Sequence, residues 1–237
     1  MKKLTLSVIA LSCFTASVSS HAVTLAESAY VSAKVGVGIE NAHNNKYSFT
    51  VTDVTTTPAT NYPGSVSIKS DSQSVFTGSL AYGFNLAPVY NIPVRAELEY
   101  AYHDTADFDY SQVYSGYQLS TKVQTVMLNG YYDFKNKSAF TPYVSLGLGS
   151  ASLKTTEHDN AGFSKTKTNN DFAWSVGLGV AYTINPNFSV DLGYRYLDAG
   201  KASVNDSGTI DPTLIYRDNT KAKISSHDVT LGLRYAF

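Results

Sequence analysis

The sequence predicts an all-β protein: a transmembrane, eight-stranded antiparallel up-and-down β-barrel with long extracellular loops and short periplasmic turns. Three observations lead to this prediction. The first 22 residues have the pattern of a secretory signal peptide. Eight later segments alternate apolar and polar residues with a period of two, which is typical of strands with two different faces. Aromatic residues gather at both ends of the apolar faces, as two membrane interfaces favour.

The N-terminal segment is predicted to be removed, which leaves residues 23–237 as a single barrel domain. Met1-Lys2-Lys3 is basic, Leu4 to Ser17 is apolar or small, and Ser20-His21-Ala22 fits a small-x-small cleavage site. A membrane-spanning helix is the alternative, but it needs about 20 mainly apolar residues. Here Ser and Thr interrupt a shorter run, so a signal peptide is the better interpretation.

Composition narrows the possible chemistry. The only cysteine, Cys13, lies in the segment to be removed, so the mature chain is expected to have no disulfide, cysteine-bound metal or cysteine nucleophile. Loss of Lys2 and Lys3 leaves 16 basic residues against 19 acidic ones, a net charge of −3. This balance predicts no nucleic-acid partner, and no motif suggests a cofactor. The 18 Tyr and 11 Phe residues favour strands.

The strands follow one another with a regular alternation of long and short connections. The predicted strands are residues 29–40, 74–84, 94–103, 119–134, 140–152, 172–184, 188–196 and 229–237. Long polar loops are predicted at residues 41–72, 104–118, 153–170 and 200–223. The other links are short, such as Asn185-Pro186-Asn187, a tight turn. All long loops therefore fall at one end of a meander.

The third predicted strand shows most clearly that the two faces differ. Arg95, Glu97, Glu99 and His103 alternate with apolar and aromatic residues. Buried charges cost several kcal/mol each unless they are paired, so this face must meet water or other charges. The start of the fourth strand is less regular, because Lys122 and Gln124 fall on its apolar face. We expect these two residues to lie above the apolar band.

The position of the aromatic residues distinguishes a membrane barrel from a soluble one, which would bury the apolar faces inside. At the short-turn ends lie Tyr82, Phe84, Tyr132, Phe134, Phe140, Tyr182, Phe188, Tyr235 and Phe237. At the long-loop ends lie Tyr100, Tyr102, Phe172, Trp174, Tyr194 and Tyr196. Mostly aliphatic residues and glycine separate the two groups. Two aromatic girdles around an aliphatic band predict an outer-membrane barrel with its charges inside.

Several strand motifs resemble the opacity family of Gram-negative outer-membrane proteins. They are Ile92 to Tyr100, Tyr131 to Lys135, Phe140 to Val144, Leu192 to Tyr196 and Ser226 to Phe237. The resemblance covers most of the barrel and implies a porin-like fold and a surface antigen in the outer membrane. Neisserial members bind host-cell receptors through variable outer loops. Here the first loop is the longest and the second and third are short, so no loop residue is carried over.

The lumen is predicted to hold a set of charges that form either a structural ion-pair network or an ion-selective pore. The set is Lys34, Arg95, Glu97, Glu99, Asp133, Asp191, Arg195 and Arg234. Because eight strands enclose a space that side chains just fill, the network is favoured over the pore.

Enzymatic and metal sites are weaker interpretations of the same sequence. Three His-Asp neighbours, among them His103-Asp104 and His227-Asp228, suggest a barrel hydrolase. Sequence neighbours on a strand point to opposite faces, however, so they form no dyad directly. Asp104, Asp107 and Asp109 suggest calcium, but Gln112 stands where an EF-hand loop needs glycine. We therefore expect no catalytic, metal or cofactor residue.

The function predicted from the sequence is the display of four surface loops for interaction or adhesion with host or environmental ligands. The alternative is a structural or narrow-pore protein without a specific ligand. The first loop region carries Tyr47, Phe49, Val51, Val54 and Tyr62 among polar residues. A solvated antigenic loop is the favoured interpretation, and the alternatives are hairpin strands that extend the barrel or apolar contacts to a partner. Expected partners are outer-membrane lipids, the barrel-assembly machinery and a host-cell receptor, and the protein is expected to be a monomer.

The last strand is predicted to close the barrel against the strand that begins near Tyr30. Its apolar face should meet lipid, and Arg234 should point into the lumen. Tyr235 and Phe237 should belong to the periplasmic girdle. In the opacity-like family a terminal strand that ends in Phe resembles the signal that the barrel-assembly machinery recognises.

Overall fold

The computed structural model describes residues 28–113, 115–158, 162 and 164–237. The predicted signal segment and Cys13 lie outside these residues. The elements are β1 (Ala29–Asp53), β2 (Thr60–Ile68), β3 (Asp71–Asn85), α2 (Ala87–Tyr90), β4 (Val94–Asp109), β5 (Gln118–Asp133), β6 (Phe140–His158), β7 (Ser164–Thr183), β8 (Phe188–Asp211) and β9 (Leu214–Ala236). In this part of the chain, no helix is long and apolar enough to cross a membrane.

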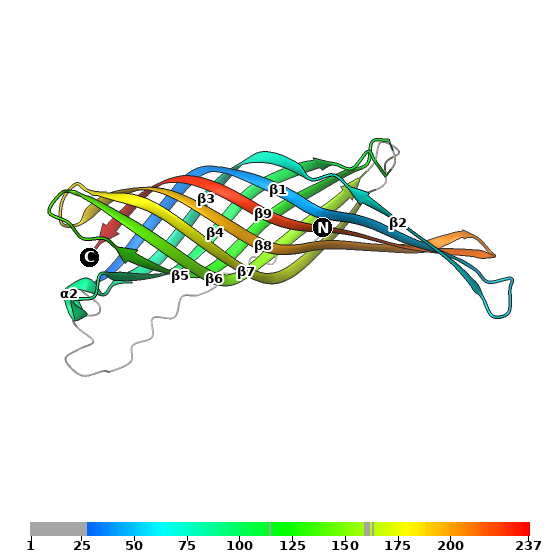
Figure 1. The fold of residues 1–237 in the computed structure, drawn as a ribbon, viewed down its shortest axis with the longest axis horizontal. Helices are drawn as coiled ribbons and strands as arrows, with labels where there is room; N and C mark the ends of the chain where they lie inside the picture. Colours follow the sequence, from blue (N-terminus) through cyan, green and yellow to red (C-terminus); the bar gives the residue numbers. More distant parts are fainter. Residues whose placement is uncertain (1–27, 114, 159–161, 163) are drawn as a thin grey trace, which may run out of the picture.

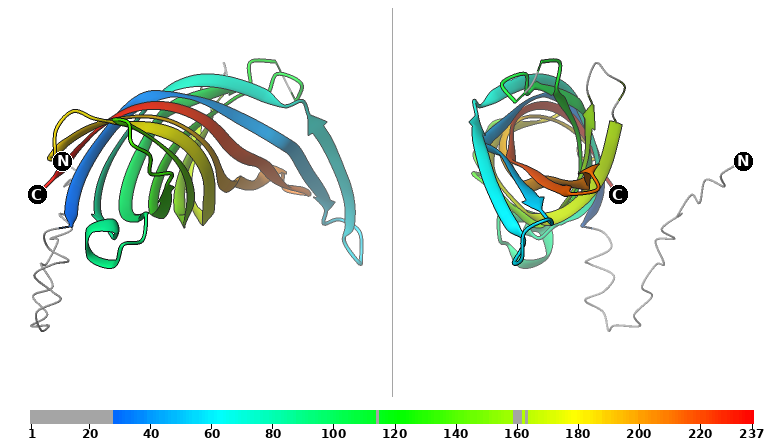
Figure 2. Two further views of the ribbon diagram at one scale, coloured as in Figure 1. Left: turned by 60° about the vertical axis from the view of Figure 1, so that its left-hand side comes forward. Right: turned by 90° about the vertical axis from the view of Figure 1, so that its right-hand side faces the viewer.

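The strands form a closed antiparallel ring (Figures 1 and 2). β1 pairs with β3, each of β3 to β8 pairs with the next strand in the chain, and β9 returns to β1, while β2 pairs only with β1. The ring in the described residues therefore has eight strands, as predicted. At the seam Tyr30 lies opposite Ala236 and Val37 opposite Val229. The Phe237 N–H donates to the Ala29 carbonyl at 3.1 Å, which extends the seam to the last residue.

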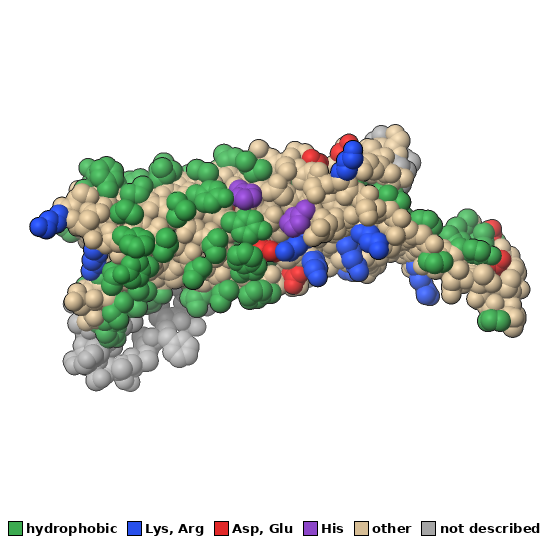
Figure 3. Space-filling view, viewed as in Figure 1, with side chains coloured by type: hydrophobic (Ala, Val, Ile, Leu, Met, Phe, Trp, Pro, Cys, Tyr) green, Lys and Arg blue, Asp and Glu red, His purple; other side chains and the backbone are tan. Residues whose placement is uncertain are grey.

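An apolar belt surrounds the ring, as the alternation predicted. Leu80, Leu128 and Leu146 each expose more than 60% of their surface, and Figure 3 shows hydrophobic side chains over this part of the barrel. Aromatic rings border the belt on both sides. Phe188 packs against Tyr235 at one end, with centroids 4.9 Å apart, and Trp174 packs against Tyr196 at the other, at 5.5 Å.

The short connections and the C-terminus lie at the same end of the ring (Figure 1). Asn185 shapes one of these turns, because its side-chain oxygen accepts hydrogen bonds from the backbone N–H groups of Asn187 and Phe188, each at 2.9 Å. In outer-membrane barrels the short turns are periplasmic and the longer connections extracellular. This end is therefore the periplasmic one.

The prediction of four long polar loops was wrong in detail, because most of each segment is strand. β1 continues to Asp53 and β2 occupies much of the rest of residues 41–72, so the alternative of hairpin strands is correct there. Residues 104–118 and 153–170 contain the ends of β4 to β7, and residues 200–223 contain those of β8 and β9. Outside lipid a strand needs no apolar outer face, and the periodic signal disappears although the backbone ladder continues.

The interior changes character above the belt. There most of the inward-facing residues are apolar and form a cluster, called here the outer core: Ala42, Ile68, Val75, Ala106, Phe108, Tyr110, Tyr117, Leu119, Val123, Met127, Ala151, Leu153, Ala173, Leu197, Ala199, Ala202, Ala222 and Ile224. Thr121, Thr155 and Glu157 are buried on the same inner face. The outward residues at this height are polar. Lys122 and Gln124 face outward, because they alternate with the buried Thr121 and Val123. Gln124 lies opposite Tyr102 of the outer girdle and Lys122 lies one step beyond it, which agrees with the expected position above the band.

The role of Phe237 in assembly generates the first prediction. Deletion of Phe237 should reduce the folded barrel in the outer membrane at least fivefold, because it removes the last seam hydrogen bond and the ring that packs on Tyr235. Phe237→Tyr keeps both and should insert almost normally. Folded protein in outer-membrane fractions can be measured by its heat-dependent shift in gel mobility. Equal amounts for the two variants would contradict the role.

Candidate functional site

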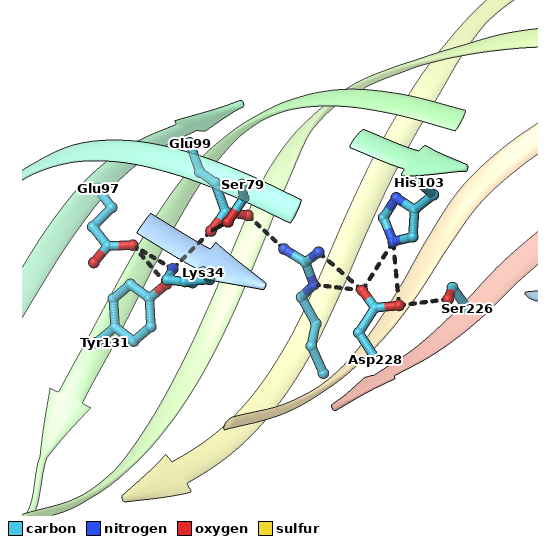
Figure 4. Close-up of polar contacts among 9 residues, drawn as sticks. Lys34, Ser79, Glu97, Glu99, His103, Tyr131, Ser226 and Asp228 are labelled. Atoms are coloured by element: carbon cyan, nitrogen blue, oxygen red, sulfur yellow. Dashed lines mark hydrogen bonds and ion pairs between the residues drawn. The ribbon is translucent and has the colours of Figure 1, made fainter. Parts of the chain in front are cut away.

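The lumen at membrane height contains a chain of ion pairs that connects strands across the barrel (Figure 4). Lys34 of β1 lies at its centre, because its Nζ donates to Glu97 at 2.9 Å and to Glu99 at 2.7 Å, both on β4. The Tyr131 hydroxyl of β5 donates to Glu97 at 2.8 Å. Lys34 and both carboxylates face inward at alternating strand positions, and only β3 separates β1 from β4 in the ring, which explains why these side chains meet.

Arg195 of β8 continues this chain toward the extracellular side. Its guanidinium donates to Glu99 at 2.5 Å and to Asp228 of β9 at 2.9 Å. Asp228 also accepts a hydrogen bond from Ser226, and its Oδ2 lies 3.1 Å from His103 Nε2. Arg195 therefore connects the two acidic positions, so that neither carboxylate is left without a cation.

Further ion pairs lie nearer the periplasm. Arg95 forms a bidentate ion pair with Asp133, in which Nε and Nη2 each lie 2.9 Å from a carboxylate oxygen. The Arg95 guanidinium also lies 3.9 Å from the Glu97 carboxylate. Arg234 is 3.8 Å from Asp191. The structure thus places each of the eight predicted lumen residues in at least one ion pair. Arg234 and Asp191 form a separate pair, and the other six residues belong to one continuous group.

The sequence interpretation left out several members of this network. Asp228 was considered only as part of a His-Asp neighbour, His103 was placed on the charged face of its strand but not in the lumen set, and Tyr30 and Tyr131 were assigned no role in that set. Tyr30 donates to Glu97 at 3.0 Å. Parity was the signal that could have identified Asp228, because it shares the inward face of the last strand with Arg234. Parity also placed Tyr30 on the face of Lys34 and Tyr131 on the face of Asp133, so their inward direction could be predicted, although their hydrogen-bond partners could not.

The space left in the lumen is small beside this network. A cavity of about 40 Å³ borders Lys34, Glu99 and Arg195. This volume holds only a few water molecules, since one water occupies about 10–15 Å³ on this measure. A larger cavity of about 360 Å³ opens at the periplasmic mouth, beside Arg95 and Arg234. The network therefore separates that mouth from the outer core.

The His-Asp contact does not form a nucleophilic triad. Ser226 donates its hydroxyl proton to Asp228 rather than to His103, so the histidine activates no hydroxyl. His227 faces outward, where its Nδ1 lies 2.7 Å from the Tyr194 hydroxyl. This arrangement is consistent with a structural role for the buried pair.

The acidic residues of the second outer segment do not converge either. Asp104 accepts from the backbone of Thr105, Asp107 from Ser120, and Asp109 from the backbone of Ser111. Throughout the described ranges, no group of three or more His, Cys, Asp or Glu side chains is placed to hold a metal ion.

The second candidate site is an extension of the barrel on the extracellular side, called here the arm: residues 45–68 of β1 and β2 and residues 201–220 of β8 and β9. The pairing of β7 with β8 ends at Trp174 and Asp198, and that of β1 with β3 ends at Ala42 and Asp71. Beyond these points the same sheet continues with only four strands, in the order β2-β1-β9-β8. Figure 1 shows it projecting from the barrel.

One face of the arm, continuous with the lumen, is aromatic and apolar. It is called here the inner face, and its members are Tyr47, Phe49, Val51, Tyr62, Val66 and Tyr216. In the strand register Val66 lies opposite Tyr47, and Val51 lies between Tyr62 and Tyr216. The opposite face carries mainly serine, threonine, asparagine and basic residues. The two faces of the arm therefore have different chemistry.

Glycines support the rings on this face. A Cβ atom at Gly64 would collide with the Phe49 ring, and one at Gly208 would come within 2.6 Å of the Tyr216 ring. The rings therefore lie flat across glycine on the neighbouring strand. Polar groups border them: Tyr47 donates to Asp218 and Tyr216 to Asp206. Asp206 also accepts a hydrogen bond from Lys165, which lowers its pKa.

Comparisons with known proteins agree with this architecture. A family model described as an outer membrane protein beta-barrel domain matches residues 6–237. The chain is 31% identical over 225 residues to the outer membrane protein PagN of Salmonella typhimurium, covering 89% of this chain and 90% of PagN. It is 28% identical over 179 residues to a Rickettsia conorii protein described as an adhesin candidate, covering 69% and 68% of the two chains.

Among solved structures, Neisserial surface protein A resembles this chain with a TM-score of 0.51 and 16% identity, over 89% of this chain and 97% of that one. At this identity the likeness shows the fold alone. The opacity resemblance pointed to the same class of protein, although the match is to the wider family. The protein is thus located in the outer membrane of a Gram-negative cell, and its chain belongs to the outer membrane protein beta-barrel domain family.

Proposed function

We propose that the protein is a surface adhesin and that the inner face of the arm contacts the ligand. The observation that carries this proposal is the group of exposed aromatic and apolar side chains on the part of the chain farthest from the membrane. Tyr62 exposes 56% of its surface and Phe49 37%. The exposure of apolar surface to water is unfavourable, and a group of exposed apolar side chains on one face is typical of a binding surface.

The local geometry suits recognition. Tyrosine and phenylalanine supply a large contact area and few rotatable bonds, so they lose little conformational freedom on binding. The glycines beneath Phe49 and Tyr216 hold the rings flat before a ligand arrives. Asp206 and Asp218 border them with hydrogen-bonding groups. A ligand with an apolar surface and polar substituents would match this arrangement.

The similarity to the Rickettsia conorii protein supports this proposal, because that protein is described as an adhesin candidate. The ligand is accordingly proposed to be a host-cell or environmental surface molecule. The barrel supplies the membrane anchor, and the arm supplies the contact surface.

Adhesion should depend on the inner face. Bacteria that lack other adhesins and display the Phe49→Ser/Tyr62→Ser variant should bind epithelial monolayers at least fivefold less than bacteria that display the wild type. The reason is the loss of two exposed rings from one surface. Bound cells can be counted by plating, with surface amounts matched by whole-cell immunoblotting.

The matched control is Thr50→Ala/Ser65→Ala, on the opposite face of the same two strands. It should bind like the wild type. Unchanged binding by the aromatic variant, at equal surface amounts, would leave the alternative of a barrel without a specific ligand.

For the lumen we propose a structural role: the ion pairs and the outer core together close the barrel. Side chains of an eight-stranded barrel fill its interior, and the cavity of about 40 Å³ beside Lys34 and Arg195 fits that expectation. The outer core adds an apolar layer above the charges. An ion would have to pass both layers, so a narrow pore is the less favoured role.

Conductance measurements test the closed lumen. Purified protein in planar bilayers should show little or no steady conductance, because both lumen layers must be disrupted before water forms a continuous path. A porin of known conductance, reconstituted in parallel, checks that insertion is detected. Large and uniform channels from the wild-type protein would overturn the proposal.

The network should also contribute stability. Lys34→Met leaves Glu97 and Glu99 without their shared cation, and breaking a buried pair in this way costs about 3–5 kcal/mol. The midpoint of urea unfolding in lipid vesicles should therefore fall clearly, measured through the fluorescence of Trp174, the only tryptophan. Lys135→Met, at an exposed periplasmic position, should leave the midpoint unchanged. Equal midpoints for both variants would contradict the role.

A further inference from the structure

Four lysines and a histidine lie together on the outer surface, where the barrel passes into the arm. In the register of β8, β9 and β1, Lys201 lies opposite Lys223, which lies opposite His43. One step farther from the membrane, Lys221 lies opposite Lys46. These five residues are called here the basic patch. Figure 3 shows basic side chains and histidines on this side of the molecule.

Two bulges, one in β1 and one in β8, turn Lys46 and Lys201 outward. The register shifts in β1 between His43 and Lys46, where Asn44 has a φ of 54°, and in β8 between Asp198 and Gly200, where Gly200 has a φ of 84°. Each bulge reverses the parity of the residues above it. Without them, Lys46 and Lys201 would face the lumen.

Two carboxylates lie beside the four lysines of the basic patch. Asp171 accepts a hydrogen bond from the backbone N–H of Lys201 at 2.8 Å. Asp198 pairs with Lys223 at 2.6 Å, which raises the pKa of that lysine. Lys46, Lys201 and Lys221 have no ion pair with a described residue. Like charges directly opposite each other on neighbouring strands destabilise a sheet, and here Lys201 faces Lys223 and Lys221 faces Lys46. An external anion would relieve this repulsion.

The height of the basic patch above the apolar belt indicates that the anion lies in the headgroup layer of the membrane. The outward residues just below it are Asp198, Ser225 and Asn41, and below these come Tyr196, His227 and Ile39 at the upper edge of the apolar belt. From His227 to Lys223 is four residues, roughly 13 Å along the strand and roughly 10 Å along the membrane normal at the usual tilt. Lysine side chains can bend back toward the membrane, so their ammonium groups reach the headgroup layer.

We propose that the basic patch binds the phosphate groups of the phosphorylated glycolipid that forms the outer leaflet of the outer membrane. That lipid places two phosphates at the level of the headgroups, where the two rows of lysines lie. Binding there would satisfy the facing lysines and fix the orientation of the arm above the membrane. This site is separate from the proposed ligand surface, which lies on the other face of the same sheet.

A sulfated polysaccharide from outside the cell has similar charge chemistry but fits the position less well. The patch faces sideways, at the base of the arm and next to the lipid, whereas a soluble polymer would more readily meet residues at the far end. The lipid is also permanently adjacent to the barrel. The observations therefore favour the lipid as occupant.

Titration of the folded full-length barrel in non-ionic detergent micelles tests this proposal. The probes are bisphosphorylated lipid A, dephosphorylated lipid A and soluble heparin. Binding is followed by the emission of Trp174, which packs on Tyr196 two rows below the patch, and separately by the shift of the thermal unfolding midpoint. The wild type should bind bisphosphorylated lipid A at least tenfold more tightly than the dephosphorylated form.

The variant Lys46→Gln/Lys201→Gln/Lys221→Gln should lose at least tenfold in affinity for bisphosphorylated lipid A. Each basic residue near an anionic lipid surface contributes a factor of roughly five. Lys46→Arg/Lys201→Arg/Lys221→Arg retains the charge and should bind like the wild type. Lys135→Gln/Lys137→Gln/Lys167→Gln changes the net charge equally at positions outside the patch and should stay within twofold.

Three results would overturn the proposal: equal binding of both lipid A forms, equal losses in the patch variant and the charge-matched control, or patch-dependent binding of heparin without binding of lipid A. The last result would identify a polysaccharide site. The Phe49→Ser/Tyr62→Ser variant should bind lipid A normally, so failure of the adhesion proposal and failure of this one are distinguishable.

Discussion

The structure depends on one constraint, which is that a backbone N–H or C=O group in lipid must find its partner within the protein. The seam between β1 and β9 meets this constraint, because it removes the two edges that an open sheet would present to hydrocarbon. Its register, with Tyr30 opposite Ala236, brings the ends of the barrel domain to the periplasmic side. Closure with eight strands also fixes a narrow interior, which side chains have to fill.

The way the interior is filled follows from the outer environment at each height. Within the belt the outer face must be apolar, so polar and charged residues are left for the inside, and Lys34 and Arg195 connect their carboxylates into one chain. Above the belt the outer face meets water. The same strands then place Phe108, Leu119 and Leu153 inside, as a soluble barrel would. The lumen therefore consists of an ionic layer beneath an apolar one, with no change of strand.

This inversion explains how much could be predicted from the sequence. The alternation of apolar and polar residues at membrane height was strong enough to predict all eight strands, their faces and the closing pair of strands. The reason is that every outward-facing side chain in the hydrocarbon layer has to be apolar. Above the belt the prediction of loops was wrong, since serine, threonine and lysine on the outer face hide the strand pattern. The irregular start of the fourth strand carried the missing signal. Lys122 and Gln124 occupy outward-facing positions of this strand although both are polar. Leu119 and Val123, at its inward-facing positions, are residues of the outer core.

The lumen ion pairs and the basic patch also differ in how far the sequence predicts them. Lys34 and Glu99 keep a constant parity from the start of their strands, so their inward direction could be predicted, although their partners across the ring could not. Lys46 and Lys201 lie beyond bulges, and counting by twos from the apolar belt places both of them inside. Only the structure shows the shift of one residue in β1 and in β8. Because both shifts occur just above the aromatic girdle, they turn positive charge outward at the height where the proposed contact with lipid phosphates would form.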